Sequence, residues 1–295
     1  MKRNLYLVFI IAAGLCGAAL RCICLLHGYE ADSGLPKEGY LPSLLLAGLT
    51  IAVIVLAIAL SRAWFGACRQ QGFEQLFGNA KGLTWLITLF MGIWIMLESV
   101  NSLLLLPDQI AEQFMMEGSV VVMPSRMMAG ATALVWVLSL VSGLCMVLFA
   151  VWQHSGKPAT KRTGLLATLP ILWGCIDLIM VYHENSGNPV LSDYSYTLLL
   201  IIAVMLTFYS IGGFLYSGKS PAVRFFASAG IAVYLALMQM GGTSIWSLIE
   251  TDGIGIAQLL GTSAAMRMHI YFSLAIYLML QLGNAAIRSQ RDTTT

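Results

Sequence analysis

Three ionisable side chains lie within long apolar stretches of the sequence: Arg21, Glu98 and Asp177. A charged group at the centre of a membrane-spanning helix costs about 2.5 to 3.5 kcal/mol on insertion scales, so it normally faces a partner or a water-filled cavity. We therefore expect these side chains to lie inside a bundle of helices. There they can fix the packing or hold a ligand.

Arg21 and Asp177 occupy matching places in two of these stretches. Arg21 precedes His27, and Asp177 precedes His183, by the same six residues, or about 9 Å along a helix. Opposite charges at equal depth predict an ion pair at the interface of two similar halves of the protein. Two interpretations remain open, a binding site for a ligand or ion and a buried ion pair that only fixes helix packing.

A weak internal repeat supports this match. Each of the two stretches is followed by a serine–glycine pair, a proline and a tyrosine. Later in the chain, one offset aligns Arg126 with Arg267 and Glu98 with Gln239. The pattern predicts two parallel four-helix repeats, residues 1–155 and 156–295. Glu98 and Gln239 would lie near the predicted pair, and Arg126 and Arg267 would form its outer rim.

Metal and cofactor chemistry has weaker support. Two symmetric histidines, His27 and His183, could ligate a haem iron, but histidine is also common where helices leave the membrane. His269 is a further candidate with no stronger claim. The methionines clustered near Arg126 and Arg267 would suit Cu(I), yet methionine ordinarily fills apolar contacts. We expect no cofactor.

Enzymatic signatures are also missing from the sequence. It contains no HExxH, no GxSxG and no phosphate-binding glycine loop. The six cysteines lie mostly in apolar stretches and show no CxxC spacing, which argues against a zinc site or a disulfide framework. The sequence therefore does not favour an enzyme.

The elements that must position these residues are membrane-spanning helices. Hydrophobic residues make up 58% of the 295 residues and charged residues 10%, whereas soluble domains have about 25% charged residues. Apolar stretches of about 18 residues or more predict spans. We predict an all-α polytopic membrane bundle of eight transmembrane helices, at residues 4–27, 41–62, 83–106, 127–152, 164–183, 195–216, 222–247 and 264–286.

The distribution of basic residues predicts the orientation. With the amino terminus inside, the cytoplasmic segments hold 12 lysines and arginines and the outer segments hold 3. The positive-inside rule then predicts a cell-membrane protein with both termini cytoplasmic. The basic inner face suits anionic lipid headgroups, and it lacks the charge density and aromatic residues of a nucleic-acid groove.

The leading functional expectation is binding or transport of a small molecule, ion or lipid headgroup through an outward-facing polar centre between the repeats. Arg21 would bind an anion or pair with Asp177 and Glu98. The alternative is a non-catalytic membrane scaffold or accessory subunit whose charges only lock the bundle. A membrane enzyme or haem electron carrier ranks third. The expected partners are membrane lipids, a small-molecule or ion ligand and an additional membrane subunit.

Overall fold

The protein is a bundle of long helices. The computed structural model describes the chain except residues 1, 31–34, 67–72, 78–82, 117–125, 158–159, 186–190, 218–221, 251–262 and 292–295. Among the described residues, eight helices are long and apolar enough to cross a membrane, which confirms the predicted fold class. They are α1 (Lys2–His27), α2 (Leu41–Phe65), α4 (Leu83–Met116), α5 (Arg126–Ser155), α6 (Lys161–Asn185), α7 (Leu191–Ser217), α8 (Ala222–Glu250) and α10 (Ser263–Arg291), with the short α3 (Phe73–Leu76) between α2 and α4.

Each predicted span falls within one of these helices. The largest difference is in α4, which was expected to end before Pro107 but continues to Met116 with the proline inside it. Proline lacks a backbone N–H and disfavours the helix interior. It is tolerated in membrane helices, where neighbouring groups or water can bond the freed carbonyl. The proline therefore did not mark the end of the element.

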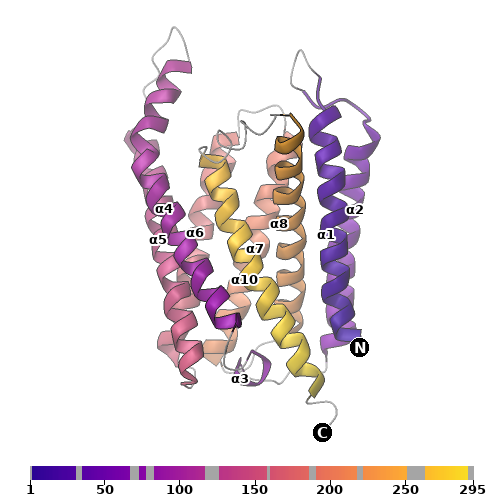
Figure 1. Cartoon of the computed structure of the whole chain (residues 1–295), viewed down its shortest axis with the longest axis vertical. Coiled ribbons are helices and arrows are strands. Elements are labelled where there is room, and N and C mark those ends of the chain that lie inside the picture. The colour runs from indigo at the N-terminus through magenta and orange to yellow at the C-terminus, as the bar shows by residue number, and fades with distance from the viewer. Residues whose placement is uncertain are drawn as a thin grey trace.

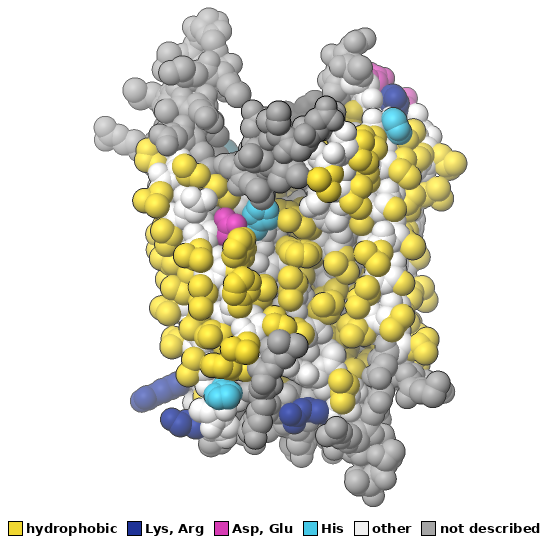
Figure 2. Space-filling model, in the orientation of Figure 1, with side chains coloured by type: hydrophobic (Ala, Val, Ile, Leu, Met, Phe, Trp, Pro, Cys, Tyr) yellow, Lys and Arg dark blue, Asp and Glu magenta, His cyan; other side chains and the backbone are white. Residues whose placement is uncertain are grey.

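Successive spanning helices run in opposite directions (Figure 1). The start of α1 and the end of α10 lie at the same end of the bundle, together with α3 (Figure 1). We call this the terminal end and the opposite one the far end. Hydrophobic side chains cover the middle of the face drawn in Figure 2, and lysine and arginine side chains lie at both ends of it, mostly at the terminal end.

The helices differ in how much of their surface other helices cover. Buried residues make up 67% of the most apolar window of α8 but 22% of those of α2 and α4. In Figure 1, α1 with α2 and α4 with α5 lie at opposite sides of the bundle, with α7, α8 and α10 between them. Central helices such as α8 and α10 therefore expose less of their surface than α2 and α4 do.

The two predicted repeats do not form separate bodies. Helices α1 and α2 pack on α8, whereas α4 packs on α5 and α10, so helices of the first unit contact helices of the second. The long α1–α8 interface has no comparable counterpart between α6 and α4 in the described chain, although the repeat would pair them. The structure does not confirm the repeat, and the division at residue 155 stays a prediction.

Candidate functional site

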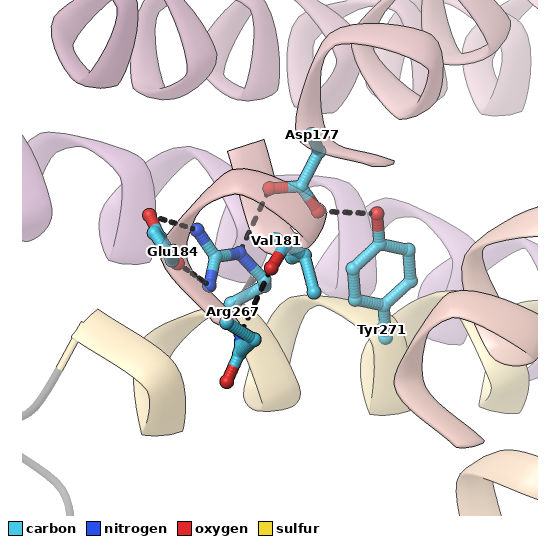
Figure 3. Close-up of polar contacts among 6 residues, drawn as sticks. Asp177, Val181, Glu184, Arg267 and Tyr271 are labelled. Carbon is cyan, nitrogen blue, oxygen red and sulfur yellow. Dashed lines mark hydrogen bonds and ion pairs between the residues drawn. The ribbon is translucent and has the colours of Figure 1, made fainter. Parts of the chain in front are cut away.

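The most charged part of the described bundle interior lies between α6 and α10, near the far end (Figure 3). Arg267 donates from Nε to Asp177 Oδ1 at 2.8 Å, and from Nη1 and Nη2 to the Glu184 carboxylate at 3.1 and 3.2 Å. The Tyr271 hydroxyl donates to the other Asp177 oxygen at 2.6 Å. We call Asp177, Glu184, Arg267 and Tyr271 the arginine cluster.

Helix periodicity places these four side chains. Glu184 follows Asp177 by seven residues and Tyr271 follows Arg267 by four, so each pair lies on one face of its helix. The backbones of α6 and α10 do not pack closely in the described chain, and long side chains bridge the space between them. An acid on α6 can therefore bond to α10 only where α10 supplies a side chain as long as arginine or tyrosine.

An aromatic layer lies on the terminal side of the arginine cluster. The ring of Trp173, one turn before Asp177 on α6, stacks on Tyr271 with centroids 5.0 Å apart. Beyond it, a small apolar pocket lies between α5, α6, α7 and α10, with Ala167 and Tyr277 among its lining residues. The charged groups are thus separated from the apolar space in the terminal half.

Burial differs across the arginine cluster. The side chain of Asp177 is 0% exposed and that of Arg267 is 8% exposed, whereas that of Glu184 is 32% exposed. A buried ion pair needs good geometry and further hydrogen bonds to offset desolvation, and both partners here have them. Asp177 is therefore the enclosed partner of Arg267. Glu184, next to the last residue of α6, is the partner that solvent reaches.

A second ion contact joins α10 to α4. His269 Nδ1 lies 3.2 Å from Glu98 Oε1, and the two side chains are 12% and 13% exposed. Residues two apart on a helix point about 200° apart, so His269 and Arg267 project from opposite sides of α10. Nearby, Ser102 donates to Met266 Sδ at 3.0 Å. One turn of α10 thus carries an arginine and a histidine toward different neighbouring helices.

The predicted pairing of Arg21 with Asp177 is wrong, because Asp177 pairs with Arg267. The expectation that Arg267 would be a rim residue is also wrong, because its side chain is buried in the cluster. Arg21 is buried elsewhere: it packs against Gly242 of α8, and its guanidinium carbon lies 5.8 Å from the ring centroid of Tyr196 on α7. The α1–α8 contact directs Arg21 away from α6.

The remaining predicted site residues are dispersed. Gln239 is buried in α8, and its amide nitrogen has no hydrogen-bond partner among the described residues. His27 and His183 are exposed at the far ends of α1 and α6, and the Arg126 side chain lies outside the described residues. No group of three or more histidine, cysteine, aspartate or glutamate side chains in the described chain could hold a metal ion.

Two members of the cluster, Glu184 and Tyr271, were not among the predicted site residues. Glu184 directly follows the predicted end of its span at residue 183, and Tyr271 is not charged. A usable signal was present in the spacing. An acid seven residues after Asp177, and a tyrosine four residues after Arg267, each mark a shared helix face.

The fold and this cluster define a multi-pass membrane protein with an enclosed arginine–carboxylate centre between its helices. Comparison with known protein families, with curated proteins and with solved structures finds no match. A guanidinium forms paired hydrogen bonds with carboxylates and with phosphates, and here a partly exposed carboxylate occupies that position.

Proposed function

We propose that this membrane protein binds or transports a small molecule, ion or lipid headgroup at the arginine cluster, and that the ligand presents a carboxylate or phosphate group to Arg267. One observation carries the proposal. The two Nη atoms of a buried guanidinium are held by the carboxylate of Glu184, which is 32% exposed at the end of a helix.

The guanidinium geometry supports an anionic ligand. Its planar fork matches carboxylates and phosphates through two parallel hydrogen bonds, the arrangement that Glu184 adopts at 3.1 and 3.2 Å. A ligand anion can take this place when Glu184 turns into solvent. Arg267 would stay in position through Asp177, which is itself held by Tyr271. The exchange replaces one carboxylate partner by another anion.

The direction of access follows from the proposed orientation. The described arginines near helix ends include Arg62, Arg162, Arg224 and Arg288, all at the terminal end of the bundle. Under the positive-inside rule this end faces the cytoplasm of the cell, both termini are cytoplasmic, and the arginine cluster opens outward. The basic end would also attract anionic membrane lipids. An additional membrane subunit is compatible with this arrangement.

A second candidate function is a non-catalytic scaffold or accessory subunit. It is favoured by the bonding of Arg267, since all three of its guanidinium nitrogens donate to carboxylates within the chain. In this alternative Glu184 is a permanent partner, and the cluster only ties α6 to α10. The two functions differ in whether another anion can replace Glu184.

Removing the carboxylate of Glu184, which would compete with an anionic ligand for Arg267, tests this difference. The purified full chain is screened by thermal shift against small carboxylates, inorganic phosphate and bilayers with or without phosphatidylglycerol. Wild type, Glu184→Gln and Arg267→Lys are compared, with the exposed Glu38→Gln as control. We expect that at least one anion stabilises wild type. This anion should bind Glu184→Gln about tenfold more tightly than wild type, which corresponds to about 1.4 kcal/mol, and should not stabilise Arg267→Lys.

The screen separates the sources of the anion, because soluble carboxylate or phosphate acts without phosphatidylglycerol and a lipid headgroup does not. A thermal midpoint that no anion shifts, in both wild type and Glu184→Gln, would support the scaffold and remove the binding proposal. Equal anion affinity in wild type and Glu184→Gln would remove the role assigned to Glu184.

A further inference from the structure

The contact between Glu98 and His269 lies within the spanning parts of α4 and α10. On the face drawn in Figure 2, an acidic and a histidine side chain interrupt the hydrophobic band below the far end. Glu98 and His269 make such a contact at 3.2 Å, and both are mostly shielded from solvent. Both groups can bind a proton, so the protonation of this pair decides its charge.

The charges around the pair come from few groups. Glu98 is the one charged residue in the described span of α4, Thr84–Pro107. On α6, Asp177 and Glu184 face Arg267, on the opposite side of α10 from His269. On α5, the described neighbour of this part of α4 is Ser139, which accepts a hydrogen bond from Ser99. No described cation other than His269 lies within 4.0 Å of Glu98.

Proton count therefore decides the energy of the pair. With one proton, the pair is either an imidazolium beside a carboxylate or a neutral imidazole beside a carboxylic acid, and both are neutral overall. Without that proton, a bare carboxylate is left in the apolar band, which carries a large desolvation cost. With two protons, the pair carries an unpaired positive charge. The one-proton state is the one that suits this environment.

We propose that Glu98 and His269 form a proton-binding site, which holds one shared proton between α4 and α10 at neutral pH. Histidine suits this role because imidazole is the side chain that ordinarily changes charge near neutral pH. The other described histidines, His27, His154 and His183, lie at helix ends and are exposed. This site stands apart from the proposed anion site.

Two spectroscopic signals locate the proton. Nitrogen NMR of histidine-labelled full chain reports whether His269 is an imidazolium, and infrared spectroscopy reports whether Glu98 is a carboxylic acid. His269→Gln and Glu98→Gln assign the signals, and both keep a hydrogen-bonding side chain of similar size. His183→Gln serves as a control that removes an exposed histidine signal.

At neutral pH we expect one of the two signatures and not both. An imidazolium at His269 with ionised Glu98, or a carboxylic acid at Glu98 with neutral His269, supports the site. In the first case the imidazolium signal should be lost in Glu98→Gln, and in the second the acid band should be lost in Glu98→Gln and persist in His269→Gln, because an ionised Glu98 would be costly in the apolar band. A neutral His269 beside an ionised Glu98, or both groups protonated, would overturn the proposal.

Discussion

Two interfaces of the bundle use polar side chains in different ways. Between α1, α2 and α8 the hydrogen bonds that join the helices come from hydroxyls, beside the buried Arg21: Tyr6 donates to the Phe226 carbonyl at 2.8 Å, and Thr50 lies 3.0 Å from the Tyr234 hydroxyl. Between α4, α6 and α10 the polar groups are carboxylates, a guanidinium and an imidazole. Among the described residues, no ion pair joins α1, α2 and α8 to one another. The ion contacts of the bundle interior join α4 and α6 to α10.

The difference lies in what each group needs from another helix. Thr50 also donates to Leu46 O in its own helix at 2.8 Å, so the loss of Tyr234 would not leave its hydroxyl unbonded. Asp177 is enclosed and has its partners on α10, so their loss leaves a buried charge. Hydroxyl contacts thus add modestly to packing, whereas the charged contacts make α6 and α10 depend on each other.

The largest expected effect comes from Asp177→Leu. Arg267 would keep only the partly exposed Glu184, and breaking a buried ion pair costs about 3 to 5 kcal/mol. The measurement is the free energy of unfolding in mixed micelles. The double variant Asp177→Leu/Arg267→Leu should lose less, because no buried charge is left unpaired. A double variant as unstable as the single one would contradict the buried-charge argument.

A matched pair of tyrosine variants compares the two interfaces directly. Tyr271→Phe removes a hydrogen bond to a carboxylate and should cost about 1.5 to 3 kcal/mol, whereas Tyr234→Phe removes one to the neutral hydroxyl of Thr50 and should cost about 0.5 to 1.5 kcal/mol. Both tyrosines are buried, so the loss of burial is similar. The measurement is the thermal midpoint of each purified variant. An equal decrease in midpoint for both variants would contradict the proposed difference between the interfaces.

A third comparison tests the packing interface alone. An alanine Cβ at Gly230 of α8 would meet the Tyr6 hydroxyl and lie 3.0 Å from Tyr6 Cζ. Such overpacking costs about 1 to 3 kcal/mol. The control is Gly48→Ala in α2, where nothing lies within 4 Å of the new Cβ and alanine favours the helix. Comparable unfolding free energies for the two variants would show that α1 and α8 tolerate separation.

Much of the fold could be predicted from the sequence, because membrane spans depend on local hydropathy and length. All eight spans were found within a few residues of their observed positions, apart from the extension of α4. The partner of each helix is not local information. The alignment of His27 with His183 suggested which helices were equivalent, but it did not show which helices touch.

The charged site could be predicted only in part for the same reason. Glu98 and Asp177 were singled out because an acid inside a span needs a partner, and both have one. Arg267 was assigned to the rim because it lies three residues after the predicted start of its span. A side chain so close to a helix end can still be buried when the adjacent helix supplies acids at that depth, as α6 does.

The opposite directions of Arg267 and His269 on α10 restrict how this helix can move. Turning α10 about its own axis would lengthen the contacts to Glu98 and Asp177 at the same time, since rotation moves the side chains on both sides of the helix away from their partners. A tilt that carries α4 and α6 along with α10 would preserve both. Any change of shape in this protein that uses α10 should therefore be a joint displacement of three helices rather than the rotation of one.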